Sequence, residues 1–303
     1  MNNIDDVVAA LGAKNYIADR SLATVVYLSL KLDKPIFLEG EPGVGKTELA
    51  KVLADILQTQ LIRLQCHEGL DTQTALYEWN YPRQMLELRL QEAQGIDKEQ
   101  IGANIFSEDF LLERPLLQAI RGIDKAPVLL IDEVDRSDEE FEAFLLEVLS
   151  DFQITIPEIG SIRAAKVPVV VLTSNRTREL HDALKRRCIY HWIDYPDVEK
   201  EMEIVRARVP DIDAQLSEQL AFFMRRLRND DLYKQPGIAE TIDWAQALVE
   251  LGAVELDAVT IEATLGCIVK YKGDVDRLRD IGVEQLLRDA DDARAFAGSP
   301  TTR

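Results

Sequence analysis

The sequence predicts an α/β domain in which helices flank a parallel sheet, followed by a smaller, all-helical domain. Over the first two thirds of the chain, short runs rich in β-branched residues alternate with helical patterns, which is typical of parallel sheets. After Pro196 the apolar residues recur only at helical spacing. We therefore expect one domain at residues 1–195 and a second at residues 196–303, with a frayed tail from Asp291 onward.

The expected strands are short apolar segments bounded by turn or helix signals. They lie at residues 35–39, 61–66, 127–132, 167–174 and 189–195. A helical run, ELAKVLADIL, follows the first of them, and helical spacing continues from Val198. The alternation predicts strand–helix–strand units in the first domain.

The charge balance excludes some classes of partner. The chain has 303 residues, with 35 basic and 54 acidic side chains and a formal net charge of −19. Because such a surface repels phosphate backbones, we expect no nucleic-acid partner unless a local basic groove exists. The beginning MNNIDDVVAALG lacks the features of a signal peptide, and the apolar runs are shorter than the roughly 18 residues of a membrane span. These features predict a cytoplasmic protein without a membrane span.

The cysteines do not predict a metal site. Cys66, Cys188 and Cys267 are dispersed, without a CxxC pair or histidines at ligand spacing. Buried free thiols are the expectation.

A glycine-rich loop lies between the first expected strand and the helix after it. LEGEPGVGKTE contains the pattern GxxxxGK[ST], whose glycine backbone cradles phosphates at a helix N-terminus. Lys46 is expected to reach the β- and γ-phosphates of ATP, and Thr47 to ligate Mg²⁺. A chance match in a glycine-rich turn is the alternative. The expected binding residues are Gly40, Glu41, Pro42, Gly43, Val44, Gly45, Lys46, Thr47 and Glu48.

An acidic pair ends the apolar strand VLLIDE. We expect Asp132 to hold the magnesium shell and Glu133 to polarise a water for attack on the γ-phosphate. A solvated Asp–Glu pair is the alternative. This pairing predicts hydrolysis by water, and the absence of an NKxD guanine reader argues against a GTPase.

Two later residues complete a hydrolase set. Asn175 ends the strand VPVVVLTSN and could position the attacking water, although a strand-end asparagine is often only a turn residue. Arg186 and Arg187 follow on a short helix, where an arginine could act on a neighbouring subunit's γ-phosphate. A solvated basic helix end is the alternative for this pair.

The order GEPGVGKT, LLIDE, LTSN and LKRRC, followed by a helical lid, resembles an AAA+ ATPase. The stretch DEVDRSDEEFEAFLLEVLSDFQITIPEIGSIRA, with a hairpin after a helix, is similar to the MoxR family within that class. The segment QCHEGLDTQTALYEWNYPRQML resembles the CoxD-type ATPases of carbon monoxide dehydrogenase maturation.

The resemblance implies a homo-oligomeric ring, most simply a hexamer, with ATP sites between subunits. It implies that Gly40 to Thr47 is Walker A, that Asp132 and Glu133 are Walker B, and that Asn175 is sensor 1. Arg187 matches the arginine finger better than Arg186 does. The resemblance places Tyr16 and Ile17, in the stretch up to Asp19, beside adenine, with simple helix entry as the alternative. It further implies a von Willebrand factor A-domain partner and a metalloenzyme client, such as a molybdenum carbon monoxide dehydrogenase.

The lid departs from the family pattern. Members commonly bring a sensor 2 arginine from a GxSxR-like stretch, whereas here its place falls on Ala239, with Glu240 next. Arg225, Arg226 and Arg228 could compensate, but a solvated helical face is the simpler expectation. A nucleotide-gated scaffold with little turnover therefore stays open. A DNA-acting motor also stays open, because it would share the nucleotide-binding motifs. The aromatics Tyr77, Trp79 and Tyr81 and the hairpin at 153–164 are candidate client-contacting or moving elements, with packed aromatics as the alternative.

Overall fold

The computed structural model describes residues 1–93, 105–122 and 124–297 of the chain. Within them the chain forms two compact units. Unit one comprises Met1–Val7, Arg20–Glu39 and Thr47–Trp192, and unit two comprises Val8–Asp19, Gly40–Lys46 and the residues from Ile193 onward. The division into domains at 195/196 stays a prediction. Nothing in the sequence predicted that Val8–Asp19 and Gly40–Lys46 group with the C-terminal helices.

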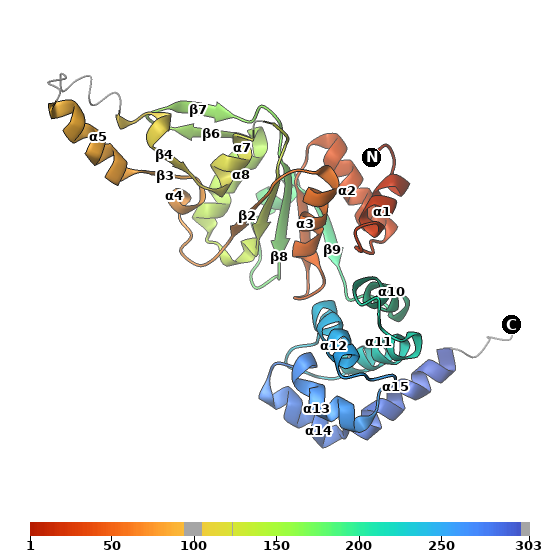
Figure 1. The fold of residues 1–303 in the computed structure, drawn as a ribbon. Coiled ribbons are helices and arrows are strands. Elements are labelled where there is room, and N and C mark those ends of the chain that lie inside the picture. The colour runs from red at the N-terminus through yellow and green to blue at the C-terminus, as the bar shows by residue number, and fades with distance from the viewer. Residues whose placement is uncertain (94–104, 123, 298–303) are drawn as a thin grey trace. The chain divides into compact units, whose positions relative to one another are not determined.

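Unit one is built on a five-stranded parallel sheet with helices against both faces (Figure 1). The strand order is β2-β5-β8-β1-β9. The predicted fold class is confirmed, and each strand lies within its expected segment or one residue beyond it. The strands are β1 (Ile36–Gly40), β2 (Leu61–Gln65), β5 (Val128–Asp132), β8 (Val169–Ser174) and β9 (Ile189–Ile193).

The register of the sheet brings the carboxyl ends of three strands together. Gln65 of β2 pairs with Asp132 of β5, and Leu172 of β8 pairs with Ile131 of β5. Strands β1 and β5 are buried at every residue, as expected for central parallel strands covered on both faces. Polar residues that end β2, β5 and β8 therefore meet at one edge, where ligands of α/β sheets bind.

The other elements of unit one are helices and two small antiparallel pairs, β3 with β4 and β6 with β7. The β6–β7 pair is the hairpin expected at 153–164. The elements are α2 (Arg20–Leu32), α3 (Lys46–Leu57), α4 (Thr72–Ala75), β3 (Tyr77–Trp79), α5 (Tyr81–Ala93), η1 (Glu108–Phe110), β4 (Leu111–Glu113), α7 (Pro115–Ile120), η2 (Val134–Arg136), α8 (Glu139–Asp151), β6 (Gln153–Ile156), β7 (Gly160–Arg163) and α9 (Asp182–Arg187).

The three aromatics that follow α4 have different environments. Trp79 is buried in the core of unit one and meets Phe106 edge to face, with ring centroids 5.4 Å apart. Tyr77 packs against the same core, whereas Tyr81 is 60% exposed at the start of α5. Packing therefore accounts for Trp79 and Tyr77, and Tyr81 alone is free to meet another molecule.

Unit two consists mainly of helices, and its core is centred on Trp244, whose indole nitrogen donates to the Thr264 hydroxyl at 2.8 Å. Helix α15 continues to Ala297, so the fraying expected from Asp291 does not begin there, and residues 298–303 lie outside the described residues. The helices are α1 (Ile4–Gly12), which begins in unit one, α10 (Val198–Arg208), α11 (Ala214–Arg228), α12 (Ile238–Glu250), α13 (Ala258–Ile268), α14 (Lys272–Ile281) and α15 (Val283–Ala297). Among the described residues, none of the helices has the length and apolar character needed to cross a membrane.

Candidate nucleotide-binding and hydrolysis site

The predicted phosphate-binding loop is divided by the two units, since Gly40–Lys46 groups with unit two and Thr47 with unit one. At two positions of this loop the backbone requires glycine. A Cβ on Gly40 would lie 2.2 Å from the carbonyl oxygen of Ile193, so no larger residue fits. Gly43 has φ of 80°, in the left-handed region that favours glycine.

Lys46 begins α3, and its side chain turns back to the loop. Its Nζ atom donates to the carbonyl oxygens of Gly40 and Glu41, each at 2.7 Å, and the residue is 6% exposed. The first turn of a helix offers amide groups without helical partners and a positive dipole end. A buried ammonium group at this position makes the loop a suitable anion site.

Tyr16 and Ile17 belong to unit two together with the loop. The Tyr16 hydroxyl donates to the carbonyl oxygen of Gly45 over a long 3.4 Å, while Ile17 is half-buried. The structure thus brings Tyr16 to the loop, and the adenine role of both residues stays a prediction.

The turn that opens α12 lies against the loop within unit two. The amide of Ala239 donates to the carbonyl oxygen of Gly43 at 3.1 Å. A Cβ built on Gly43 would lie 3.0 Å from Oε2 of Glu240, the same atom that accepts from the Gly237 amide at 3.0 Å. Ala239, Glu240 and Thr241 carry no guanidinium. A carboxylate therefore lies beside the loop, one residue after Ala239, where the arginine of the family pattern was expected to fall.

The expectation of a solvated face on α11 is wrong for two of its three arginines. The side chain of Arg228 is 8% exposed and forms a two-pronged ion pair with the buried Glu201, with both bonds at 2.7 Å. Arg226 pairs with Asp289 at 3.0 Å, and Arg225 is exposed as expected. Since Arg226 and Arg228 are already bound to carboxylates, neither replaces the missing lid arginine without breaking an ion pair.

Asp132 ends β5 and is surrounded by donors within unit one. Its Oδ1 atom accepts hydrogen bonds from the hydroxyls of Thr47, at 2.9 Å, and Thr173, at 2.5 Å. Its Oδ2 atom accepts from Arg63, from Nε at 3.0 Å and from Nη2 at 2.5 Å. The structure thus unites the two residues predicted to hold magnesium, because Thr47 contacts Asp132 directly.

Glu133 follows in a constrained backbone conformation. Its φ and ψ are 55° and 49°, which is uncommon for a residue other than glycine, and its amide donates to the Thr173 hydroxyl at 2.9 Å. Oε2 accepts from Gln65 at 3.1 Å and pairs with Arg136 at 3.0 Å, while Oε1 accepts from the Asn175 amide at 3.4 Å. Asn175 therefore lies beside the expected catalytic base, and its water-positioning role stays a prediction.

Asp135 was not singled out from the sequence, yet it orders the loop after β8. It is 2% exposed, and its carboxylate accepts from the backbone amides of Asn175, at 3.2 Å, and Thr177, at 2.8 Å. Thr173, Gln65 and Arg63 were also missed. The signal for the last two was the alternation of polar and apolar residues in LIRLQC, which places them on one side of β2.

Arg187 lies at the exposed end of α9. Its Nε donates to the hydroxyl of Ser150 at the end of α8, and its Nη1 donates to the carbonyl oxygen of Ala183 at 3.3 Å. Arg186 is also exposed. A guanidinium at the surface is available to another subunit, and the finger role stays a prediction.

The donor set of Thr47 and Asp132 suits magnesium. Magnesium prefers oxygen ligands and is commonly held by one or two carboxylates together with substrate phosphates. The described residues contain no cluster of three or more histidine, cysteine, aspartate or glutamate side chains that could hold a metal on its own. A site completed by phosphate oxygens therefore fits this chain better than an all-protein cage.

The cysteines are free, and Cys66, directly after β2, is buried, whereas Cys188 and Cys267 are half-buried. Burial raises the pKa of the Cys66 thiol to about 12, helped by the negative charges of Asp132, Asp135 and Glu133. Since the thiolate is the reactive form, Cys66 is a packed side chain and not a nucleophile.

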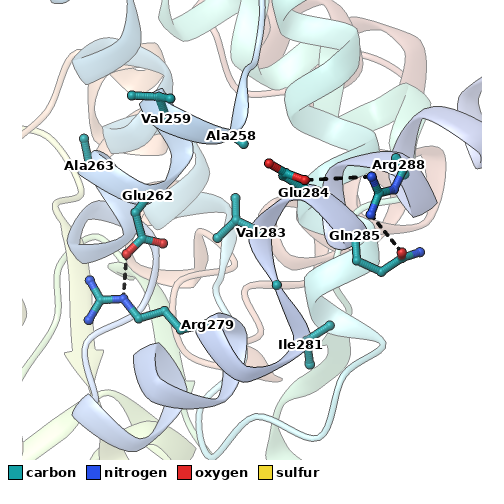
Figure 2. Close-up of a pocket in the computed structure, with 11 residues that line it drawn as sticks. Ala258, Val259, Glu262, Ala263, Arg279, Ile281, Val283, Glu284, Gln285 and Arg288 are labelled. Carbon is teal, nitrogen blue, oxygen red and sulfur yellow. Dashed lines mark hydrogen bonds and ion pairs between the residues drawn. The ribbon is translucent and has the colours of Figure 1, made fainter.

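A separate hollow of about 820 Å³ lies in unit two among α13, α14 and α15 (Figure 2). Its arginines are already paired, Arg279 with Glu262 at 2.6 Å and Arg288 with Glu284 at 3.9 Å. No residue of the predicted site lines it. The hollow therefore offers no unpaired charge for an anionic ligand.

Comparison with known proteins matches the part of the chain that carries these residues. A family model described as the AAA domain of the dynein-related subfamily (AAA_5) matches residues 35–188. This range includes the loop, the Asp132–Glu133 pair, Asn175 and Arg187.

Two curated proteins are similar over most of their length. An uncharacterized protein of Staphylococcus aureus is 27% identical over 266 residues, which cover 86% of this chain and 90% of that protein. The gas vesicle ATPase GvpN of Haloferax mediterranei is 27% identical over 262 residues, which cover 83% of this chain and 73% of GvpN. Among solved structures, the RuvB Holliday junction branch migration motor of Thermotoga maritima is similar in fold, with a TM-score of 0.44 and 19% identity over 82% of this chain and 67% of that chain.

Proposed function

The chain belongs to the dynein-related subfamily of AAA domains and is an ATPase, and we propose that it couples magnesium-dependent hydrolysis of ATP to the remodelling of a client protein. The observation that supports this function best is the hydrogen-bonded set at the ends of β5 and β8. Asp132 contacts Thr47, and Glu133 contacts Asn175, and these two contacts support the proposed roles of the first pair in holding the metal and of the second in activating water.

The loop and α3 bind the phosphates in this proposal. Backbone amides of Gly40–Lys46 and the helix dipole stabilise the negative charge, and Lys46 exchanges its two carbonyl partners for phosphate oxygens. Thr47 and Asp132 hold Mg²⁺, which neutralises charge on the phosphate oxygens when it is bound. This chain therefore supplies binding and charge stabilisation from two consecutive residues, Lys46 and Thr47.

Glu133 then takes the proton of the attacking water. Its side chain is 30% exposed, so one side can meet solvent while Gln65, Arg136 and Asn175 hold the carboxylate in place. A positioned carboxylate contributes about 10²- to 10⁴-fold as a general base. Arg187 of a neighbouring subunit stabilises the charge on the transferred phosphoryl group.

The ring, the partner and the client follow from the MoxR-type resemblance. We propose a hexameric homo-oligomer, a von Willebrand factor A-domain partner, and a metalloenzyme client of the carbon monoxide dehydrogenase class. The exposed Tyr81 and the β6–β7 hairpin are the candidate elements that carry the nucleotide state to the client.

One observation favours a second function, that of a nucleotide-gated scaffold with little turnover. The lid turn at Ala239–Thr241 presents a carboxylate and no arginine to the loop, so closure of the lid on the γ-phosphate lacks its usual cation. Release of phosphate by the isolated chain or by the chain with its partner decides between the two functions. A DNA-acting motor is disfavoured by the net charge of −19, and stimulation of hydrolysis by DNA at moderate salt would support it.

Replacing Lys46 by alanine tests the proposed function. The variant is expected to bind ATP about 100-fold more weakly, because charge-assisted hydrogen bonds to phosphate are lost, and to show no turnover. Lys51→Ala is the matched control, because Lys51 lies on the same helix with a side chain that is 56% exposed. Calorimetric titration with Mg-ATP gives both affinities. Equal affinity of Lys46→Ala and the unsubstituted protein would exclude the loop as the ATP site.

Replacing Glu240 by glutamine tests the effect of the lid carboxylate on the loop. The amide oxygen keeps the hydrogen bond from the Gly237 amide, while the negative charge beside Gly43 is removed. Because like charges repel, we expect ATP and ADP to bind about fivefold more tightly and ADP to dissociate more slowly. Stopped-flow displacement of a fluorescent nucleotide measures both, with Glu250→Gln at the end of α12 as the control. An unchanged or weaker affinity would show that Glu240 is too well screened to act on the phosphates.

A further inference from the structure

The carboxylate of Asp132 has no obvious room for another partner. Its Oδ1 atom accepts from the hydroxyls of Thr47 and Thr173, and its Oδ2 atom accepts from Nε and Nη2 of Arg63. An ionised carboxylate offers about four lone-pair sites. Because these sites are all used, ligation of a metal ion by Asp132, directly or through a water, requires one donor to leave.

The donors differ in how easily they can leave. Thr173 is 1% exposed within β8, and its hydroxyl also accepts from the Glu133 amide. Thr47 lies in the first turn of α3 and is itself a predicted metal ligand. Arg63 has a side chain that is 52% exposed, while that of its partner Asp132 is 4% exposed. A long, half-exposed side chain can move into solvent without any change of backbone, so Arg63 is the donor free to leave.

Arg63 also provides the charge that Asp132 needs in the absence of a metal. A buried carboxylate without a counter-ion is costly, and a forked guanidinium bonded through two nitrogens is a strong substitute for a cation. A guanidinium and a divalent metal ion on the same carboxylate repel each other. The two cations therefore compete for the negative charge of Asp132.

We infer that Arg63 is an internal counter-ion of Asp132 that competes with magnesium, so that magnesium binding displaces the Arg63 side chain. This inference rests on the proposed function and concerns the same site. It makes Arg63 a positioning residue, one that sets the magnesium concentration at which the nucleotide site fills. The second contact of Arg63, from Nη2 to Oε1 of Gln65 at 2.5 Å, gives the guanidinium a neighbouring acceptor on the same strand.

The test is a magnesium titration at a fixed concentration of a fluorescent, non-hydrolysable ATP analogue. In Arg63→Met the magnesium concentration at half-saturation is expected to fall about fivefold, because the metal no longer has to break the ion pair between Arg63 and Asp132. The effect is modest because the Arg63 side chain is half-exposed. Binding of the analogue in EDTA is expected to stay within about twofold of that of the unsubstituted protein, since the loop is unchanged.

Arg136→Met is the matched control. It removes a guanidinium that pairs with Glu133 at 3.0 Å and leaves Asp132 untouched, so its magnesium midpoint is expected to be unchanged. An equal fall in both variants would mean general electrostatics and overturn the inference. So would an unchanged or higher midpoint in Arg63→Met.

Arg63→Lys covers the case in which Arg63→Met does not fold. Lysine keeps the positive charge but cannot bond Oδ2 through two nitrogens at once, so the midpoint is expected to fall by about twofold. An unchanged or raised midpoint in this variant would also overturn the inference. If the unsubstituted protein itself shows no magnesium-dependent binding, the proposed function fails, whereas normal binding without a shift in the variants removes only the role of Arg63.

Discussion

Replacing Arg187 by alanine is expected to lower the ATPase rate by about 10³- to 10⁵-fold while ATP affinity stays nearly unchanged. The guanidinium lies on the surface at the end of α9, held by the Ser150 hydroxyl and the Ala183 carbonyl oxygen. These neutral partners are weaker than a phosphoryl group, so the side chain can turn towards an ATP bound by another subunit. Phosphate release and nucleotide binding, each measured per subunit, give the two quantities.

The control for this prediction is Arg186→Ala, which removes the neighbouring exposed arginine of the same helix. We expect it to retain most of the rate. Doping small amounts of Arg187→Ala subunits into the unsubstituted protein should lower the rate by more than the doped fraction, if the proposed ring shares its sites between subunits. A rate that is independent of protein concentration and undiminished by doping would place catalysis within one subunit. A loss of rate in Arg186→Ala instead would assign the finger to Arg186.

The main sheet could be predicted because each of its strands is a short run rich in apolar residues that can be recognised locally in the sequence. PIFLE and PVLLID are continuous apolar runs, as buried parallel strands must be, and both are buried in the structure. The β3–β4 pair could not be predicted, since each strand has three residues and their pairing joins segments far apart in the sequence. A strand of three residues is too short to show an alternation of polar and apolar residues.

The candidate hydrolysis residues were singled out from motifs, but the residues that contact and support them were not. Asp132 ends an apolar strand, and Glu133 and Asn175 each directly follow one, which makes them visible in a sequence. Thr173 and Asp135 look like an ordinary strand residue and an ordinary loop acid. Their function as supports comes from the contact of β5 with β8, which only the fold supplies.

The arginines of α11 were predicted to be solvated, but two of them are paired in the structure. Arg226 and Arg228 follow a pattern typical of a solvated face, yet their partners come from α15 and α10. Burial of Arg228 against Glu201 is a tertiary effect, because the two residues are 27 positions apart. A run of charged residues in a sequence therefore does not predict which of them form ion pairs in the fold.

Replacing Glu133 by glutamine is expected to lower turnover by about 10²- to 10⁴-fold while Mg-ATP still binds, since the base is lost and Thr47 and Asp132 are intact. The glutamine side chain has nearly the same shape, but its NH2 group is a donor. That group must now face another donor, either Asn175 or the pair Gln65 and Arg136. That mismatch is expected to cost about 1 kcal/mol of unfolding free energy. Phosphate release, nucleotide binding and thermal unfolding measure the three effects.

With ATP bound and not hydrolysed, the Glu133→Gln variant is expected to remain in the ATP-dependent oligomer, which light scattering after chromatography detects. Glu147→Gln, on the exposed side of α8, is the control for loss of one carboxylate and should assemble and hydrolyse normally. Normal phosphate release from Glu133→Gln would remove Glu133 as the base. Asp135 could not replace it, because Asp135 is 2% exposed and its carboxylate already accepts from the backbone amides of Asn175 and Thr177.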